Sequence, residues 1–371
     1  MKVIVSVTND LTTDNRVDKV CRSLTALGWE VVLVGRLLPN SLPLNRSYRT
    51  RRMRLFFKKG ALFYAEFNFR LFWLLLFSKA DVFHSNDLDT LLANGLAARL
   101  RSKKLVYDTH EYFLGTPEIQ ERPRVKATWK FIEKCFFQQP VAIFTVNHSI
   151  AGLYREDYGR TLQVMRNIPE AGQQLLRRTR AELRLPEDQF IMVLQGSGIN
   201  VDRGAEEFLM ALELLDDSFL WIIVGHGDVV PMLEKRSAAN PNLQNRVRFL
   251  PKMPYAQMMQ YTMAADLGLT LDKPTNINYL YSLPNKIFDY IRAGIPVLAS
   301  KLPEIVNVVE TYKVGFVFPD HQPETIAEML QKIRSDRAAL AKASENTAVA
   351  REELAWENEV KALEALYRSF D

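Results

Sequence analysis

The stretch SLPNKIFDYIRAGIPVLAS, residues 282–300, begins with polar side chains on a short helix whose other residues have the spacing of a buried stripe. Gly294 suits the end of this helix, and Pro296 prevents its continuation. Lys286 is unusual, because a cation in the first helical turn opposes the helix dipole at a cost of about 0.3–1 kcal/mol. An anion bound to the free N–H groups there would reverse the sign of this contribution. Two interpretations are therefore open: an anion site, or a lysine whose charge lies in water.

A second candidate anion site is the glycine-rich segment LQGSGINVDRGAEEF, residues 194–208, which follows an expected strand and opens a helix. Its glycines do not fit the dinucleotide fingerprint, and it lacks the G-K-[ST] of a P-loop. Arg203 lies in this loop, and an arginine beside free backbone amides suits a diphosphate through bidentate hydrogen bonds. The alternative is a glycine-rich turn with an exposed arginine. In the later turn VGHGDV, Gly225 and Gly227 are expected to let a ligand approach the backbone.

Polar side chains also follow expected strands in the first half of the chain, where the carboxyl ends of parallel strands bind ligands. Asp14 and Asp87 also have the place and chemistry of helix N-caps, so capping is the alternative for both. A lone histidine is more often structural than catalytic, but His110 has acidic neighbours. The candidates are Asp14 and Arg16 after the first strand, His84, Asn86 and Asp87 after another, and Asp108, His110 and Glu111 after the next.

Composition and spacing exclude several chemistries. The two cysteines, Cys21 and Cys135, lie far apart and give no disulfide framework or zinc spacing, so we expect a reducing cytosol. The five histidines lack metal-ligand spacing, and no G-x-S-x-G elbow, kinase motif set or C-x-x-C occurs. The N-terminus MKVIVSVTND turns polar too early for a signal peptide. We therefore expect a cytoplasmic protein that needs no metal and no cofactor.

The elements that must position these residues form two series in which strand-like and helix-like segments alternate. This pattern indicates parallel sheets, and over 371 residues it predicts two doubly wound domains that join near 168–185. We expect ligands in a cleft between the two domains. The expected strands are 2–7, 30–35, 80–86, 103–110 and 141–147 in the first series, and 190–196, 220–227, 247–252, 265–271, 295–300 and 314–318 in the second.

The net charge of +5 is unevenly distributed along the chain. Residues 1–170 carry 26 Lys and Arg against 16 Asp and Glu, whereas residues 171–371 carry 22 against 27. The basic excess gathers in residues 45–60, ahead of an apolar stretch whose polar interruptions exclude a bilayer span. Residues 46–77 either lie on an anionic membrane surface or form a core helix after a basic loop. No nucleic-acid-binding motif accompanies the basic cluster, so no nucleic-acid partner is expected.

Together these segments resemble the retaining glycosyltransferases of family 4, which have the GT-B fold. SLPNKIFDYIRAGIPVLAS is similar to the donor-site helix and following strand of that family, QGSGINVDRG to its phosphate-binding loop, and VGHGD to its V-G-x-G turn. DNRVDKVCRSLTALGWEVVLVGR and LVYDTHEYF resemble its N-terminal domain. The likeness implies an α/β fold of two Rossmann-like domains facing across a cleft. The acceptor-binding domain would cover 1–172, with a C-terminal helix crossing back over 352–371, and the donor-binding domain would cover 173–351.

The resemblance also implies roles for individual residues. Arg203 and Lys286 would hold the donor diphosphate, and His110 would match the cleft histidine beside the donor sugar, which makes these three the expected catalytic residues. Asp289 would replace the second glutamate of the family's E-x7-E motif, which binds the ribose. The other donor-side residues would be Gly196, Ser197, Gly225, Gly227, Lys252 and Asn285, and the acceptor-side residues Asp14, Arg16, Asn86, Asp87 and Glu111.

Two departures from the family pattern bear on activity. Tyr281 stands where the first acid of E-x7-E is usual, and Ser197 stands where a basic residue is usual. We expect transfer of a sugar from a nucleotide-diphosphate sugar to a glycan or lipid-linked acceptor, with retention, in the synthesis of bacterial surface polysaccharide or glycolipid. A nucleotide-sugar 2-epimerase of the same fold and a non-catalytic sugar-nucleotide binder are the alternatives.

Overall fold

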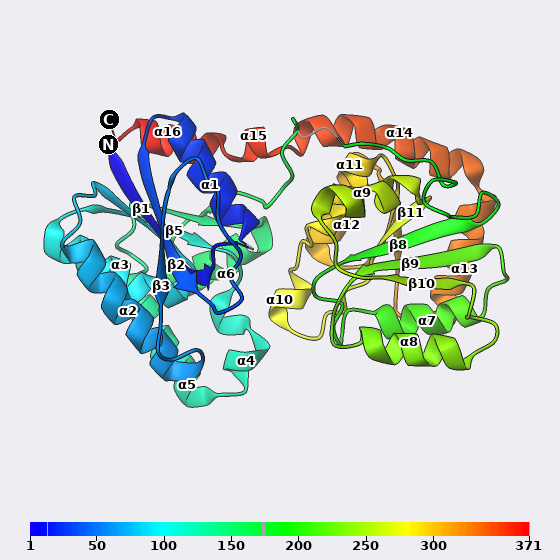
Figure 1. Cartoon of the computed structure of the whole chain (residues 1–371), viewed down its shortest axis with the longest axis horizontal. Helices are drawn as coiled ribbons and strands as arrows, with labels where there is room; N and C mark the ends of the chain where they lie inside the picture. The colour runs from blue at the N-terminus through cyan, green and yellow to red at the C-terminus, as the bar shows by residue number, and fades with distance from the viewer. Residues whose placement is uncertain (13, 173–174, 371) are drawn as a thin grey trace. The chain divides into compact units, whose positions relative to one another are not determined.

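Two parallel β-sheets flanked by helices organise the computed structural model, which describes residues 1–12, 14–172 and 175–370 (Figure 1). Each sheet belongs to its own compact unit. Unit 1 combines Met1–Asn167 with the end of the chain from Glu359 onward, and unit 2 covers Ile168–Asn358. The fold is therefore of the α/β class with two doubly wound halves, as the alternating pattern predicts.

Unit 1 contains a seven-stranded sheet in the order β3-β2-β1-β4-β5-β6-β7, in which every paired strand is parallel. The strand order reverses between β1 and β4, and such a switch point is where open α/β sheets bind ligands. The strands are β1 Lys2–Asp10, β2 Glu30–Leu37, β3 Arg49–Arg54, β4 Val82–Asn86, β5 Lys104–Thr109, β6 Ala142–Thr145 and β7 Gln163–Val164. The helices are α1 Asn15–Ala26, α2 Gly60–Leu76, α3 Leu88–Arg101, α4 Pro117–Gln120, α5 Pro123–Phe136, α6 His148–Tyr158 and α16 Lys361–Arg368, with a 3-10 turn at Phe113–Gly115.

Unit 2 contains a six-stranded parallel sheet in the order β10-β9-β8-β11-β12-β13, with its switch point between β8 and β11. Two apolar clusters fill its core, one built around α7 and α13 and the other around α11 and α12. The strands are β8 Phe190–Gly196, β9 Phe219–Gly225, β10 Val247–Leu250, β11 Leu267–Thr270, β12 Val297–Ser300 and β13 Gly315–Phe318. The helices are α7 Ala205–Glu213, α8 Val230–Ala239, α9 Tyr255–Ala264, α10 Ile277–Leu280, α11 Lys286–Ala293, α12 Pro303–Tyr312, α13 Pro323–Ser335 and α14 Arg337–Glu353, followed by α15 Trp356–Glu359.

The basic cluster of residues 45–60 contains a strand that the sequence pattern did not predict. β3 has the sequence RTRRMR and pairs with β2 at the edge of the sheet of unit 1. Charged side chains are common on edge strands, where they discourage pairing with another chain. α2 follows β3 and has both buried and exposed apolar side chains. Within the described ranges, no helix has the length and apolar character needed to cross a bilayer.

Candidate functional site

The two predicted cations of unit 2 both lie near the switch point of its sheet. Lys286 is the first residue of α11, next to Asn285, whose exposed side chain does not cap the helix. No hydrogen bond or ion pair joins the Lys286 ammonium to the residues that the structure describes. Burial lowers its pKa, the nearby Asp272 carboxylate opposes this, and Arg203 lowers the pKa further. This half-buried cation without a bonded anion is the feature that a bound phosphate would satisfy.

Arg203 is positioned by a residue that the sequence patterns missed. Its Nη1 donates to Oδ1 of Asp272 over 2.5 Å, and Asp272 is fully buried just after β11. The Arg203 guanidinium lies over the ring of Tyr279, with its Cζ 4.1 Å from the ring centroid, and its Nε is buried with no partner among the described residues. Burial opposes the charge, but Asp272 raises the Arg203 pKa above its ordinary value. The guanidinium is therefore fixed in direction, with about a quarter of the side chain exposed.

The glycines of the turn after β9 lie against the loop that follows β8. A Cβ added at Gly225 would lie 1.8 Å from the carbonyl oxygen of Gly196, and one at Gly227 would lie 1.9 Å from that of Ile199. These glycines thus let two protein loops approach each other closely. The loops are joined by backbone hydrogen bonds from His226 to Gly196 (3.2 Å) and from Ile199 to His226 (3.2 Å).

The carboxylate of Asp289 is already bonded within unit 2. Gln195 Nε2 donates to its Oδ2 over 2.9 Å, and the Tyr255 hydroxyl donates to its Oδ1 over 2.8 Å. Burial, followed by Asp289, raises the pKa of the Tyr255 hydroxyl well above its ordinary value, so this tyrosine stays a donor. Two other predicted donor residues, Ser197 after β8 and Lys252 after β10, are exposed.

In unit 1, two predicted acceptor-side residues have structural partners. Asp14 caps α1, because its Oδ1 accepts from the Val17 amide over 3.1 Å, which realises the capping alternative. Arg16 is almost fully buried and forms a bidentate pair with Asp108 at 3.0 and 2.7 Å, and its Nη1 donates to the Met165 carbonyl oxygen over 2.6 Å. Its cation is therefore used inside the unit.

His110 lies between two aspartates at the carboxyl ends of β4 and β5. Its Nδ1 is 3.2 Å from Oδ2 of Asp87, and its Nε2 is 3.5 Å from Oδ2 of Asp108. Asp87 also accepts from the His110 amide over 2.8 Å and does not cap α3, so the capping alternative is wrong for this residue. Burial alone would lower the pKa of His110, but the two carboxylates raise it well above 6.5. The two carboxylates therefore favour the charged form of the His110 imidazole.

Other polar groups surround this histidine. Burial, followed by Asp87, raises the pKa of Glu111 to about 7 and that of Asp89 to about 8. Asn86 is fully buried, and its Nδ2 donates to the Ser6 carbonyl oxygen over 3.0 Å. Over the described ranges, no group of three or more His, Cys, Asp or Glu side chains has the arrangement of a metal site.

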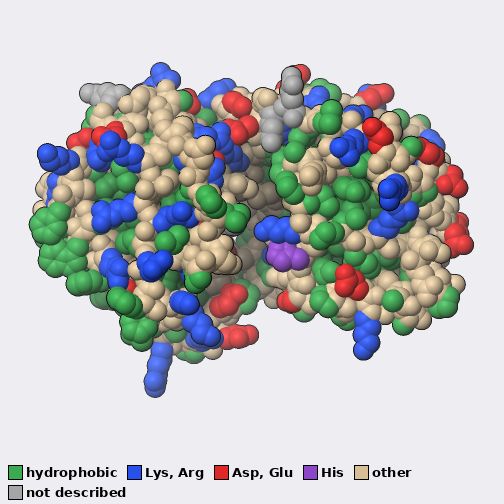
Figure 2. Space-filling view, in the orientation of Figure 1, with side chains coloured by type: hydrophobic (Ala, Val, Ile, Leu, Met, Phe, Trp, Pro, Cys, Tyr) green, Lys and Arg blue, Asp and Glu red, His purple; other side chains and the backbone are tan. Residues whose placement is uncertain are grey.

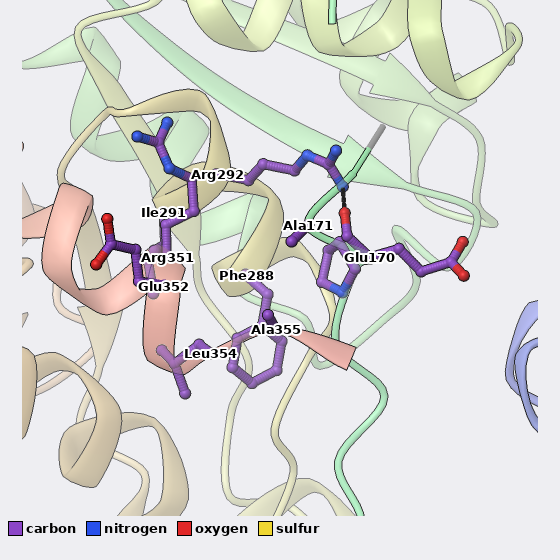
Figure 3. A pocket seen from close by; sticks show the side chains of 10 residues that line it. Glu170, Ala171, Phe288, Ile291, Arg292, Arg351, Glu352, Leu354 and Ala355 are labelled. Carbon is purple, nitrogen blue, oxygen red and sulfur yellow. Dashed lines mark hydrogen bonds between the residues drawn. The ribbon is translucent and has the colours of Figure 1, made fainter. Parts of the chain in front are cut away.

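A pocket of about 130 Å³ lies beside α11 in unit 2 (Figure 3). Phe288, Ile291 and Leu354 form part of its apolar lining, and Arg292 Nη1 donates to the Glu170 carbonyl oxygen over 2.6 Å. The lining residues do not include any of the predicted donor-site residues. This pocket is therefore separate from the cations of the candidate donor site.

Comparison with known protein families decides the classification. The family model described as Glycosyltransferase Family 4 matches residues 14–169, and the model described as Glycosyl transferases group 1 matches residues 177–349. The chain belongs to the glycosyltransferases of family 4. These two matches cover most of both units, from the residue before α1 onward, and they agree with the resemblance that the sequence motifs indicate.

Individual relatives are distant. The chain is 21% identical, over 86% of its length and 81% of the relative, to chitobiosyldiphosphodolichol beta-mannosyltransferase of Candida glabrata. Its structure is similar to sucrose-phosphate synthase from Thermosynechococcus elongatus, with a TM-score of 0.78 and 17% identity over 100% of this chain and 99% of that one. It is also similar to Anabaena HepE in complex with UDP, with a TM-score of 0.74 and 16% identity over the whole of both chains. The fold is therefore of the GT-B type.

Proposed function

We propose that this glycosyltransferase uses a nucleotide-diphosphate sugar as donor, and that unit 2 binds the diphosphate through Lys286 and Arg203. The observation that carries this proposal is the Lys286 ammonium. Burial lowers its pKa, which disfavours the charged form, and no anion of the described structure is bonded to it. A diphosphate supplies the missing negative charge, and the free N–H groups at the start of α11 add to its binding. The relative HepE, which has been solved with UDP, fits this donor class.

The proposed reaction breaks the bond between C1 of the donor sugar and the diphosphate oxygen, and forms a bond between C1 and an acceptor hydroxyl oxygen. The electron pair leaves with the diphosphate, and the departing diphosphate oxygen takes up the proton of the acceptor hydroxyl. Arg203 and Lys286 would stabilise the charge that develops on the leaving diphosphate, which is the role that a metal has in other transferases. Retention of the anomeric configuration is expected from family membership, with the acceptor hydroxyl delivered on the face that the diphosphate leaves.

We propose an electrostatic role for His110 of unit 1. Both of its ring nitrogens face carboxylates, which raise its pKa, so it would not act as a general base. A fixed imidazolium, held by Asp87 and Asp108, instead suits a hydrogen bond to a sugar hydroxyl or stabilisation of the leaving charge. We assign the acceptor to unit 1, where Glu111 has a pKa of about 7.

The acceptor is proposed to be a glycan or a lipid-linked sugar in the synthesis of bacterial surface polysaccharide or glycolipid. Such an acceptor fits a cytoplasmic protein that contacts the inner face of an anionic membrane through residues 46–77. The exposed side chains of α2, which include Phe69 and Trp73, support this contact because apolar side chains of that size are normally buried. No nucleic-acid partner is proposed.

Thermal unfolding with UDP, GDP, dTDP and CMP, without added metal, tests the donor site. A ligand at 100 times its dissociation constant adds about 2.7 kcal/mol, which corresponds to a shift of several degrees. We expect one nucleotide family to shift the midpoint, and Lys286→Met to remove the shift without lowering the midpoint of the free protein. Lys332→Met, which changes an exposed lysine on α13, is the matched control and should retain the shift.

Product assays separate the two alternatives. An epimerase would convert the nucleotide sugar without an acceptor, whereas the proposed transferase would release the sugar only to an acceptor hydroxyl or slowly to water. A non-catalytic binder, which the tyrosine at position 281 favours, would give the thermal shift without any turnover. Acceptor-independent epimerisation, or binding without turnover over a broad acceptor panel, would contradict the proposed function.

A further inference from the structure

A cavity of about 540 Å³ lies in unit 1 where β2 and β3 end and α2 begins. Its lining does not include His110, Asp87 or Asp108, and the membrane contact proposed for residues 46–77 does not assign a ligand to it. Its lining combines three cations, Arg36, Arg54 and Lys58, with apolar side chains that include Leu37 and Phe57. A cavity with cations and apolar walls suits a ligand that has an anionic group attached to a hydrocarbon part.

The three cations of this cavity are not neutralised by carboxylates. The lining contains no Asp or Glu, and no ion pair joins Arg36, Arg54 or Lys58 to a carboxylate of the described chain. The Nε of Arg36 is buried without a hydrogen-bond partner among the described residues, and its Cζ lies 5.1 Å from the ring centroid of Phe63. A buried donor without an acceptor costs free energy, and an anionic oxygen in the cavity would satisfy it.

Two carboxylates, Glu66 and Asp10, are hydrogen-bonded to residues of the lining, and both have other partners than its cations. Glu66 accepts from the amides of Phe56 and Phe57 over 2.9–3.1 Å, and its Oε1 pairs with Arg70 over 2.7 Å. Asp10 accepts from Thr12 and from the hydroxyl of Ser41. Neither carboxylate is bonded to Arg36, Arg54 or Lys58, so these three cations remain available to an anionic ligand.

Large apolar side chains surround the cavity and continue along α2. Phe56 is 84% exposed beside the cavity, and Phe57 in its lining is 45% exposed. Along α2 the exposed residues recur with helical spacing, so they share one face. Figure 2 shows Lys and Arg side chains near hydrophobic ones on the face of unit 1 turned to the viewer. The exposed residues of this row are Leu62, Phe69, Trp73 and, directly after the helix, Phe77.

We propose that this cavity binds the phosphate group of a membrane lipid, whose hydrocarbon chain continues over the exposed row of α2. The charge complementarity of the cavity selects an anionic headgroup, and the aromatic row enters the interfacial layer of the bilayer. This inference rests on the proposed function in one respect: the lipid is then the carrier of the sugar acceptor. The apolar row distinguishes a lipid phosphate from a free phosphate, because a free phosphate has no contact to make with it.

Vesicle binding by the full chain, measured by flotation without any nucleotide, tests the proposal. One set of vesicles contains phosphatidic acid, which has a terminal phosphate, and the other contains phosphatidylglycerol adjusted to the same surface charge. Arg36→Gln removes the half-buried cation of the cavity, and Arg51→Gln removes an exposed cation of β3 outside it. The unfolding midpoint of each variant, measured without nucleotide, shows that it is folded, so this test does not depend on the donor site.

We expect tighter binding to phosphatidic acid vesicles, and we expect Arg36→Gln to remove this preference. Arg51→Gln should weaken binding to both kinds of vesicle by about fivefold and leave the preference intact. Trp73→Ser should weaken binding to both without changing the preference. Equal effects of the two arginine variants would overturn the proposal, and so would the absence of vesicle binding at physiological salt. Binding of millimolar pyrophosphate to the cavity without vesicles would overturn it too, because the ligand would then be a free phosphate.

Discussion

At the scale of the residue, the two cations near the switch point of unit 2 differ in their contribution to the stability of the fold. Arg203 neutralises Asp272, whose side chain is fully buried. Arg203→Ala would leave that carboxylate unpaired, and breaking a buried pair in this way costs about 3–5 kcal/mol. We therefore expect Arg203→Ala to destabilise unit 2, whereas Lys286→Met should not. Urea unfolding measures both.

A double variant separates the pair from the site. Arg203→Met with Asp272→Leu removes both charges, so it should recover most of the stability that Arg203→Ala loses while nucleotide binding stays weak. If Arg203→Ala costs less than about 1 kcal/mol, the Asp272 carboxylate has another source of stabilisation, and unit 2 does not depend on the ion pair.

Asp289 offers a second prediction at this scale. Asp289→Asn replaces an acceptor oxygen with an amide donor beside Gln195 and Tyr255, and we expect a loss of about 1–3 kcal/mol in the free energy of unfolding. If Asp289 contacts the ribose, Asp289→Asn should also weaken nucleotide binding. Tyr255→Phe is the control, because it loosens the same carboxylate without removing its charge. Equal nucleotide affinities in both variants would contradict the ribose contact.

His84 gives a prediction about pH. Burial lowers its pKa to about 4, and its Nδ1 is hydrogen-bonded to the Tyr367 hydroxyl at 2.9 Å. The unfolded chain has a histidine pKa near 6.5, so it binds a proton more readily than the folded chain between about pH 6.5 and 4. Stability from this residue is therefore lost as the pH falls through that window, by about 3 kcal/mol in total.

Groups whose pKa values are raised by folding make the protein more stable as the pH falls, which is opposite to the effect of His84. The contribution of His84 is therefore isolated by comparison with His84→Gln. The folded carboxyls of Asp89 and Glu111 have pKa values of about 8 and 7, and both take up protons more readily than they do in the unfolded chain. We expect the stability of His84→Gln relative to the native sequence to rise as the pH falls from 6.5 to 4. A difference that does not change with pH would show that His84 is not neutral in the folded chain.

At the scale of the element, the loops after β8 and β9 depend on glycine for their mutual contact. Gly227→Ala would place its Cβ 1.9 Å from the Ile199 carbonyl oxygen, and we expect a loss of about 1–3 kcal/mol together with weaker nucleotide binding. Gly198→Ala is the matched control in the same loop pair, since its Cβ would meet nothing closer than 4.0 Å. Thermal unfolding with and without nucleotide measures both. Equal behaviour of the two variants would contradict the proposed loop contact.

Sequence periodicity predicts the elements whose burial is regular. The eleven expected strands all correspond to strands of the two sheets, because each is a short apolar run between helices. β3 and β7 were not predicted for physical reasons: β3 consists mainly of arginines at a sheet edge, and β7 has only two residues. For α2, the sequence left a core helix and a membrane helix as alternatives, and the structure shows buried and exposed apolar faces on the same helix.

The sequence predicts where the candidate site residues lie along the chain, but it does not predict which side chains they bond to. His110 directly follows β5, Arg203 lies in the loop between β8 and α7, and Lys286 begins α11, all on the C-terminal side of parallel strands, where such sheets bind ligands. The partner of Arg203 could not be predicted, since Asp272 is 69 residues away and carries no motif, although its place directly after a buried strand was a usable signal. Likewise, the motif containing Gly225 and Gly227 does not reveal that a second loop fills the space above them.

At the scale of the whole molecule, the end of the chain belongs to the unit that contains its beginning. α16 contributes Leu363 and Tyr367, both fully buried, to unit 1, and the ring of Tyr367 packs edge-on against Trp29 with centroids 5.0 Å apart. Glu359, just before this helix, pairs with Arg166 and also accepts from its amide over 2.7 Å. Unit 1 is therefore built from segments that are separated by the whole of unit 2.

Ending the chain after Asn358 should destabilise unit 1 selectively. Loss of two fully buried side chains, at about 1.5–3 kcal/mol each, predicts a decrease of about 3–6 kcal/mol, or on the order of 10 °C in the midpoint of unit 1. Calorimetry measures this, and the transition of unit 2 is identified as the one that the nucleotide shifts. Tyr367→Phe is the control, because it removes only the hydrogen bond to His84 and should cost about 1 kcal/mol. If truncation lowered the nucleotide-dependent transition and spared the other, the assignment of α16 to unit 1 would be wrong, because the side chains that it buries would then be stabilising the donor unit.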